Sequence, residues 1–163
     1  MNSPQTTPPQ LPKPPISITR RLEFDSGHRL PNHKSQCRNL HGHRYALEIT
    51  LTSTPQADVG TSDDGMVLDF GDIKAIANEK LVSVWDHAFL VYKGDTQLVE
   101  FLATIPGHKT VVLDCVPTSE NLAQAAFDIL QHAYHDRFGK ELKLTFLRLY
   151  ETPNCWADVR AAQ

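Results

Sequence analysis

The amino-acid sequence predicts an α+β domain in which a four-stranded sheet is covered on one face by two helices. Apolar and polar residues alternate along residues 16–28 and 43–53, which is the period of a half-buried β-strand. Residues 69–85 and 118–139 instead carry apolar residues at helical spacing. Two further strands are expected after the second helix, which completes the predicted sheet.

The composition is that of a globular protein with a small polar partner. Of its 163 residues, 40% are hydrophobic and 21% are charged. A net charge of −3 and a pI near 6.2 exclude the basic excess typical of non-specific nucleic-acid binders. The apolar runs are far shorter than the roughly 20 residues that a membrane span needs. We therefore expect no binding to nucleic acid and no insertion into a membrane.

Residues 1–15 contain six of the eleven prolines and lack apolar periodicity. We predict a disordered, polyproline-like tail there, followed by a single domain over residues 16–163.

The three cysteines are too few for a disulfide framework, and no apolar signal-peptide core follows Met1. These features predict a reduced, cytoplasmic compartment.

The first two strands place histidines on their apolar faces. The apolar residues of the first strand share one parity: Ile16, Ile18, Leu22 and Phe24. That parity reaches His28 unless Gly27 introduces a bulge. The apolar residues of the second strand are Tyr45, Leu47, Ile49 and Leu51. Extending their parity backwards reaches His43 and His41.

Asp69 is predicted to cap the first helix, which should end near Trp85. Its apolar stripe consists of Phe70, Ile73, Ala77, Leu81 and Val84. An irregular connection follows and ends in a short extended run over residues 110–115. Thr118 and Ser119 mark the start of the second helix. Its inward residues are expected to be Leu122, Ala126, Ile129, Leu130 and Ala133.

The strand that follows the second helix changes phase partway. Leu142, Leu144 and Phe146 have one parity, whereas Leu147 and Leu149 have the other. We interpret this change as burial on both faces of the strand. Because the two helices cover only one face of the sheet, a second apolar face predicts self-association.

Three histidines form a candidate metal site. Two histidines separated by one residue on a strand project to the same side, as His41 and His43 do on either side of Gly42. His28, at the end of the neighbouring strand, is the candidate third ligand. Three neutral imidazoles would leave zinc an open position, the arrangement of a catalytic site. The alternative is that these histidines are ordinary polar residues at strand ends.

Three further residues are candidate catalytic groups. Cys37 precedes His41 by four residues, and a nearby metal or cation would favour its thiolate, so it could act as a base or nucleophile. The alternative is a small loop residue. Asp86 and His87 offer a carboxylate beside an imidazole, a pair that can fix a tautomer and shuttle a proton. By itself such a dipeptide is a weak signal.

Glu151 is a candidate for substrate binding. A carboxylate at a pocket wall could accept two parallel hydrogen bonds from the amino-amide edge of a pterin or guanine, although an exposed, solvated glutamate explains it equally. The hydroxyls of Thr118 and Ser119 could also line a pocket, with helix capping as the alternative role.

Six motifs occur in the order FDSGHRLP, CRNLHGH, MVLDFGDIK, WDHAFL, PTSENLA and YETPNCWADV. Through these motifs the chain resembles the 6-pyruvoyl-tetrahydropterin synthase family. Within that family it resembles the bacterial 6-carboxy-5,6,7,8-tetrahydropterin synthase branch. The resemblance covers residues 16–160. The short spacing from Cys37 to His41 is similar to that of the carboxytetrahydropterin enzymes and differs from the longer gap in animal pyruvoyl-tetrahydropterin synthases.

The resemblance implies a tunnelling fold, in which a four-stranded antiparallel sheet is backed by two helices. The sheets of three subunits would join through their edges into a barrel, and two barrels would stack into a hexamer. The active sites would then lie between subunits. Zinc would be held by His28, His41 and His43. The family's general base would be Cys37, and its proton relay would be Asp86 with His87, supplied by a neighbouring chain. The pterin would be anchored by Glu151. From their charge, the candidates to bind the triphosphate are Arg29, Lys34, Arg38 and Arg44, although surface solvation explains any one of them equally well.

The implied reaction is that of an enzyme converting 7,8-dihydroneopterin triphosphate to 6-carboxy-5,6,7,8-tetrahydropterin, acetaldehyde and triphosphate, an early step toward queuosine. One alternative is a 6-pyruvoyl-tetrahydropterin synthase, which eliminates triphosphate without losing the side-chain carbons. Another is a non-catalytic zinc- or pterin-binding protein that keeps the scaffold.

Overall fold

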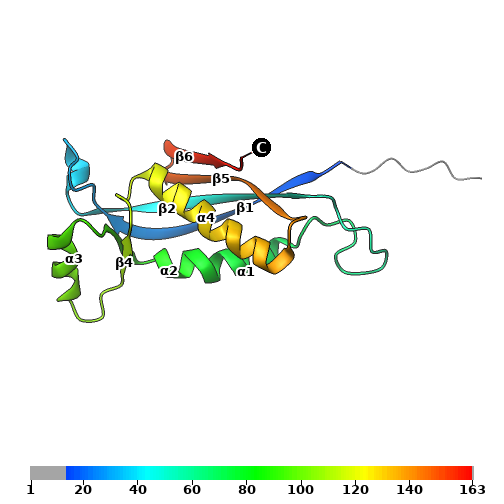
Figure 1. Ribbon diagram of the computed structural model, residues 1–163, viewed down its shortest axis with the longest axis horizontal. Coiled ribbons are helices and arrows are strands. Elements are labelled where there is room, and N and C mark those ends of the chain that lie inside the picture. The colour runs from blue at the N-terminus through cyan, green and yellow to red at the C-terminus, as the bar shows by residue number, and fades with distance from the viewer. Residues whose placement is uncertain (1–13, 163) are drawn as a thin grey trace, which may run out of the picture.

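A six-stranded mixed sheet forms the centre of the molecule (Figure 1), in a computed structural model that describes residues 14–162. The strands lie in the order β4-β3-β1-β2-β5-β6. They are β1 (Ile16–His28), β2 (His41–Ser53), β3 (Ala88–Tyr92), β4 (Thr110–Leu113), β5 (Lys143–Thr152) and β6 (Cys155–Arg160). The α+β class is therefore confirmed, and the expected count of four strands is wrong.

Helices cover one face of this sheet. Helix α1 (Phe70–Ala77) continues through a π-helical turn (Asn78–Val82) into the short α2 (Ser83–Trp85), and α4 (Ser119–Phe138) packs beside them. Figure 1 shows α1, α2 and α4 on the same side of the strands. Helix α3 (Thr96–Ala103) lies at one end of the molecule, at the same end as the loop between β1 and β2.

The long antiparallel pair of β1 and β2 is regular along its whole length. Gly27 lies directly opposite Gly42, and His28 opposite His41, so the bulge considered at Gly27 does not form. The inward residues of β2, among them Leu47 and Ile49, are fully buried against the helices. The predicted parity of both strands therefore holds as far as the histidines.

The first helix departs from its predicted stripe in two places. Asp69 caps it, with its side chain accepting the Gly71 N–H at 2.5 Å. Phe70 and Val84, however, are 47% and 43% exposed, whereas Trp85 is buried. The π-helical turn changes the helical repeat before α2, which brings Trp85 to the inner face in place of Val84. The middle of the stripe is buried as predicted.

The second helix begins where the sequence predicted it. The Thr118 hydroxyl accepts the Asn121 N–H at 3.3 Å, which satisfies one of the free donors of the first turn. Ile129 is 38% exposed and was wrongly assigned to the inner face, whereas Phe127 and Tyr134 are buried there. The Tyr134 hydroxyl donates to the Ile73 carbonyl at 2.9 Å, which ties α4 to α1.

The segment expected to be irregular is folded. Strand β3 pairs in parallel with both β1 and β4, and α3 joins β3 to β4. A small separate core supports this unit through Val91, Leu98 and Leu102. Because β3 and α3 are only 5 and 8 residues long, their patterns are too short for periodicity to identify.

The change of phase in β5 is caused by a β-bulge. Phe146 pairs with Thr50, but Leu51 pairs with Leu144, so Thr145 is an extra residue in β5. The bulge keeps Leu144 and Leu147 on the same buried face despite their different parity. Burial on both faces of β5 was therefore the wrong interpretation, and the prediction of self-association loses that support.

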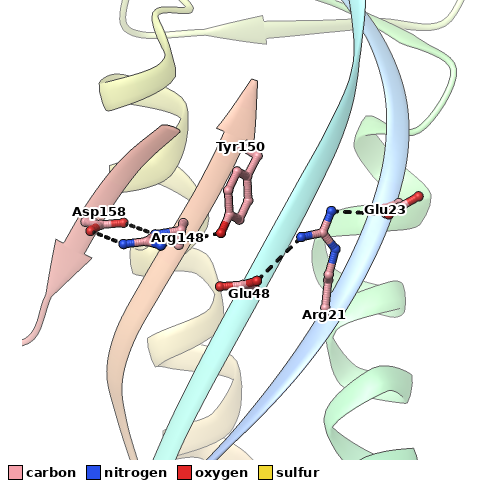
Figure 2. Close-up of polar contacts among 6 residues, drawn as sticks. All are labelled: Arg21, Glu23, Glu48, Arg148, Tyr150 and Asp158. Atoms are coloured by element: carbon pink, nitrogen blue, oxygen red, sulfur yellow. Dashed lines mark hydrogen bonds and ion pairs between the residues drawn. The ribbon is translucent and has the colours of Figure 1, made fainter. Parts of the chain in front are cut away.

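The face of the sheet away from the helices is polar. Figure 2 shows charged residues that alternate in sign across it, from Arg21 on β1 and Glu48 on β2 to Arg148 on β5 and Asp158 on β6. The Arg148 guanidinium makes two parallel hydrogen bonds to Asp158, at 2.6 and 2.8 Å. This ion pair holds the pKa of the Asp158 carboxyl below its ordinary value.

Within the part of the chain that is described, no helix has the length and apolar character that crossing a membrane requires. The predicted tail falls almost wholly on residues 1–13, which lie outside the described residues. Strand β1 begins at Ile16, the residue at which the domain was expected to begin.

Candidate active site

Three imidazoles converge at the end of β1 and the start of β2. One ring nitrogen from each of His28, His41 and His43 lies within 4.8 Å of the other two. The ring centroids of His28 and His41 are 4.5 Å apart, and those of His41 and His43 are 5.0 Å apart. Three imidazole nitrogens this close together could hold one metal ion.

Backbone carbonyls fix two of these rings. His28 Nδ1 lies 2.8 Å from the carbonyl oxygen of Pro117, and His41 Nδ1 lies 2.8 Å from that of Asn39. A carbonyl can only accept, so each Nδ1 carries the proton and each Nε2 keeps its lone pair. This tautomer presents Nε2 as the ligand atom and is the usual outer support of a metal-bound histidine.

Burial keeps His28 and His43 neutral. Desolvation, with the charges of His41 and His43, lowers the pKa of His28 to about 4, against the raising effect of its bond to Pro117. Desolvation also lowers the pKa of His43, although the nearby Glu151 carboxylate opposes this shift. Neutral imidazoles at physiological pH are the form that binds a metal ion.

The donor set fits a divalent transition metal. His28 is 1% exposed, and its Nε2 is a buried polar atom without a hydrogen-bond partner in the described structure. An unpartnered buried nitrogen is costly unless something binds it. Because this nitrogen lies beside those of two further imidazoles, a zinc ion on His28, His41 and His43 would satisfy it.

Cys37 lies in the loop that joins the two histidine-bearing strands. It occupies a single 3₁₀ turn (Gln36–Arg38) and is half-buried with a free thiol. The Leu30 N–H donates to the Cys37 carbonyl at 2.8 Å, which draws the turn back toward the end of β1. The predicted base is therefore held by the same two strands that carry the ligands.

Asp86 and His87 precede β3 and lie beside Asp25 of β1, outside the cluster of three imidazoles. The Asp25 N–H donates to Asp86 Oδ1 at 2.9 Å, and the His87 N–H donates to the Asp25 carbonyl at 2.7 Å. Asp86 Oδ2 is 2.9 Å from His87 Nδ1. The bond from Asp25, aided by His87 and Lys109, lowers the pKa of Asp86 below its ordinary value. An ionised Asp86 can therefore orient the exposed His87 ring.

His87 also has an unusual backbone. Its φ of 57° lies in the left-handed region, which is strained for a residue with a Cβ. The ring faces an open cleft of about 520 Å³, together with His43 and the paired glycines Gly27 and Gly42. A Cβ added to Gly27 would come within 2.7 Å of the Phe89 ring, so the narrow floor of this cleft needs glycine.

Glu151 reaches the histidine cluster from β5. Its Oε1 lies 3.7 Å from His28 Nε2. Tyr150 pairs with Trp156 and Thr152 with Cys155, so Glu151 is the unpaired residue of a second bulge, between β5 and β6. Bulges often redirect a side chain next to an active site. Here the bulge occurs at the carboxylate that the sequence singled out.

The hydroxyls of Thr118 and Ser119 differ in their surroundings. Thr118 caps α4, which agrees with the capping role. The Oγ of Ser119 is buried and has no hydrogen-bond partner in the described structure. Both residues follow Pro117, whose carbonyl holds His28, so the start of α4 adjoins the histidine cluster.

The four cations considered for a triphosphate are dispersed. Arg29 is bound to Asp95 by two hydrogen bonds. Arg44 lies on the polar face, where it donates to Glu23 at 3.1 Å, and it lines the cleft of His87. Lys34 and Arg38 belong to the loop that carries Cys37.

Sequence reasoning missed the surroundings of His28. The Tyr45 hydroxyl lies 3.3 Å from His28 Nδ1, and burial raises the pKa of this tyrosine. Tyr45 was assigned to the core only, since its apolar parity gave no sign of a polar contact. The carbonyls of Pro117 and Asn39 were also missed, because a backbone acceptor leaves no residue-type signal in a sequence.

A family model described as 6-pyruvoyl tetrahydropterin synthase matches residues 17–162, almost the whole described chain. The chain belongs to the 6-pyruvoyl tetrahydropterin synthase family. The expectation that it is a member of this family, and so an enzyme of the pterin synthase class, is confirmed.

Relatives in the 6-pyruvoyl tetrahydropterin synthase family carry the name of its carboxytetrahydropterin branch. A protein of Rickettsia bellii named 6-carboxy-5,6,7,8-tetrahydropterin synthase is 37% identical over 149 residues, which covers 88% of this chain and 99% of the relative. A protein of Haemophilus influenzae with the same name is 28% identical over 146 residues, covering 88% and 97%.

Solved structures share the fold of this family member. A protein of Wolinella succinogenes described as uncharacterized superposes with a TM-score of 0.73 at 23% identity, covering 92% of this chain and 100% of that one. The 6-pyruvoyl tetrahydropterin synthase of Caenorhabditis elegans gives 0.64 at 24% identity, covering 94% and 100%. These likenesses support the assignment of the fold.

Proposed function

We propose that this protein is a zinc-dependent 6-carboxy-5,6,7,8-tetrahydropterin synthase, converting 7,8-dihydroneopterin triphosphate and water to 6-carboxytetrahydropterin, acetaldehyde and triphosphate. The observation that carries the proposal is the unpartnered, buried Nε2 of His28 beside the rings of His41 and His43. It is supported by relatives of nearly equal length that bear this name.

The three histidines would hold zinc, which supplies Lewis-acid polarisation of the substrate's side-chain oxygens. Cys37 would act as the general base that removes a proton from the pterin side chain. Its loop supports this role, because the bond from Leu30 to the Cys37 carbonyl ties the turn to the strand of His28. Cleavage of the carbon–carbon bond in the side chain would follow.

Glu151 would bind the pterin ring. An ionised carboxylate can accept two parallel hydrogen bonds from the amino and amide N–H groups of a pterin. The distance of 3.7 Å from Glu151 to His28 supports this role, because a ring held by Glu151 would lie beside the proposed metal ligands. Thr118 and Ser119, at the start of α4, would line the same pocket, and the unpartnered hydroxyl of Ser119 is free to bond to substrate.

His87 would return a proton to the side chain, with Asp86 holding its ring. The dyad is not part of its own chain's histidine cluster, and it faces a cleft open to solvent. We infer that the Asp86 and His87 of a neighbouring chain complete each active site. An assembly is therefore part of the proposed function.

The sheet edges support such an assembly. Strand β1 pairs with β3 only through Ser26–His28, so residues 16–25 have no strand partner on that side within residues 14–162. Strand β6 is the other edge of the long antiparallel strands. Because β1, β2, β5 and β6 alternate in direction, β6 of one copy beside β1 of the next would continue the antiparallel order. We propose closure into trimers and their stacking into hexamers.

The proposed setting is queuosine biosynthesis in the cytoplasm. The three free cysteines, Cys37, Cys115 and Cys155, are compatible with a reducing compartment. The role proposed for Cys37 needs a reduced thiol.

Product analysis tests the reaction. Zinc-loaded protein is incubated with 7,8-dihydroneopterin triphosphate, and acetaldehyde and pterins are quantified. Equal amounts of acetaldehyde and 6-carboxytetrahydropterin are the expected result. The family model's own description favours a second candidate, 6-pyruvoyl-tetrahydropterin synthase, which would give pyruvoyl-tetrahydropterin and no acetaldehyde. Retention of unchanged substrate at all zinc loadings would contradict both activities.

A further inference from the structure

A half-buried ion pair lies next to the histidine cluster and has no part in the mechanism above. Arg29 Nε donates to Asp95 Oδ2 at 2.6 Å, and Arg29 Nη2 donates to Asp95 Oδ1 at 2.5 Å. The side chain of Asp95 is only 6% exposed, and that of Arg29 is 26% exposed. Two parallel charge-assisted bonds fix both the distance and the orientation of the guanidinium.

Asp95 occupies a position where aspartate usually has another task. It is the residue that precedes α3, and an aspartate there normally accepts a backbone N–H of the first helical turn. The Asp95 side chain makes no such bond, and the two distances above show that both of its oxygens bind Arg29. The Asp95 carboxylate therefore does not stabilise α3 as a cap, and both of its oxygens hold the Arg29 guanidinium instead.

Arg29 is the first residue of the loop that carries Cys37. It directly follows the ligand His28, and the next residue, Leu30, donates to the Cys37 carbonyl. Fixing the Arg29 side chain therefore constrains the point at which the loop leaves β1.

The far end of the same loop also meets α3. Leu40, which precedes the ligand His41, lines a pocket of about 230 Å³ together with Arg29 and the α3 residues Gln97, Leu98 and Phe101. Both ends of the loop therefore lie against α3, which Figure 1 places at the same end of the molecule.

We propose that Asp95 is a positioning residue for Cys37, acting through Arg29 to hold the base-bearing loop in its reactive placement. The proposal rests on the proposed function, since it takes Cys37 to be the base. It also gives the unit of β3, α3 and β4 a role: this unit is the platform for the loop between the metal ligands. Displacement of a reacting group by about 1 Å can cost on the order of 100-fold in rate, so a firm platform matters.

The test compares Asp95→Asn with the wild type in a Cys115→Ser/Cys155→Ser background, where Cys37 is the only thiol. The asparagine keeps the shape of the side chain and removes its charge. Three quantities are measured well below the unfolding temperature: bound zinc, steady-state kinetics, and the rate of Cys37 alkylation by iodoacetamide. Asp114→Asn is the matched control, because it removes the carboxylate of the exposed Lys93–Asp114 pair near the end of β4.

We expect Asp95→Asn to retain zinc, to lower kcat roughly 10- to 100-fold with KM changed less than about twofold, and to change the alkylation rate severalfold. The single variant Arg29→Gln and the double variant Arg29→Gln/Asp95→Asn are measured in the same way. The kcat of the double variant should be no lower than that of the poorer single variant, since both substitutions break the same contact. Asp114→Asn should behave as wild type. A lowered melting temperature with unchanged kcat and alkylation rate would overturn the proposal, as would additive losses in the double variant.

The alkylation rate keeps this test distinct from that of the proposed reaction. If the wild type fails to convert the pterin triphosphate, the proposed function is wrong, but the effect of Asp95 on the Cys37 thiol is still measured. An active enzyme whose Cys37 reacts identically in wild type and Asp95→Asn would leave the function standing and refute the positioning role.

Discussion

His28 and His41 are direct cross-strand partners, and their ring centroids lie 4.5 Å apart. Residues directly opposite each other in an antiparallel pair project to the same face, so the register of β1 and β2 alone brings these rings together. His43, two residues further along β2, falls on the same face. The site is thus built mainly by the pairing of two strands, and it should survive changes elsewhere that leave this pair intact.

Replacement of His41 by alanine should remove most of the bound zinc, because two imidazoles and water hold the ion far less tightly than three imidazoles. Zinc per chain is measured after dialysis by atomic emission. His132→Ala is the control, since this exposed histidine lies on α4 and its ring bonds to the Asp128 carbonyl of the same helix. Unchanged zinc in His41→Ala would rule out the ligand assignment.

Replacement of Cys37 by alanine should lower kcat by about 10²- to 10⁴-fold, the usual contribution of a general base, while zinc stays bound. The measurement is release of acetaldehyde under saturating substrate. Cys155→Ala, which removes another free and exposed thiol on β6, should leave the rate unchanged. Full activity in Cys37→Ala would exclude Cys37 as the base.

Replacement of Glu151 by glutamine should lower kcat/KM by about 10- to 150-fold, as expected for the loss of one or two charge-assisted hydrogen bonds worth about 1.5–3 kcal/mol. Zinc content should not change. Glu141→Gln, at an exposed site before β5, serves as the control. A Glu151→Gln enzyme with native kcat/KM would show that the pterin is bound by other groups.

The metal-free protein should lose stability as the pH falls from about 6.5 to about 4. Because the pKa of His28 is lowered from 6.5 to about 4 in the folded state, protonation favours the unfolded chain. The contribution of neutral His28 to the free energy of unfolding is fully present above pH 6.5 and is lost toward pH 4. At 1.36 kcal/mol per pKa unit, this loss is about 3 kcal/mol.

Urea unfolding of the chelator-treated protein across this pH range measures the effect. His28→Gln cannot titrate and should show a shallower dependence, whereas His132→Ala should keep the steep one. Equal slopes in wild type and His28→Gln would contradict the assignment of the shift to His28.

Assembly through the β6 edge should be sensitive to a single backbone N–H. The Ala161 N–H donates to the Thr145 carbonyl on β5 at 3.1 Å, so alternation turns the N–H of Asp158 to the other side of β6. Asp158→Pro removes that donor, whereas Asp158→Asn keeps it, and both lose the charge pair with Arg148. Sedimentation velocity should show smaller species for the proline variant only. Identical masses for the two variants would argue against pairing at this edge.

The sequence predicted the histidine cluster because strand parity is a local property. Alternation along β1 and β2 was sufficient to place His28, His41 and His43 on one face. The position of Asp86 and His87 beside Asp25 could not be predicted in this way. It depends on the parallel pairing of β3 with β1, a long-range contact between segments about 60 residues apart.

Other features depended on events that local patterns do not reveal. The π-helical turn moved Trp85 inward in place of Val84, and the extra residue Thr145 was interpreted as a second apolar face. Both are single-residue changes of register, and each shifts every side chain that follows. The partnership of Arg29 with Asp95 was missed because β3 and α3 were not predicted at all.

The bulge at Thr145 determines which way the end of β5 faces. Leu147, Leu149 and Glu151 share the inward parity only because one residue has been inserted after Leu144. Deleting Thr145 while the earlier leucines stay in place would turn Glu151 outward and bring its neighbours Arg148 and Tyr150 toward the core. A one-codon deletion far from the histidines would thus reverse a strand's two sides and remove Glu151, the proposed pterin anchor, from the histidine cluster.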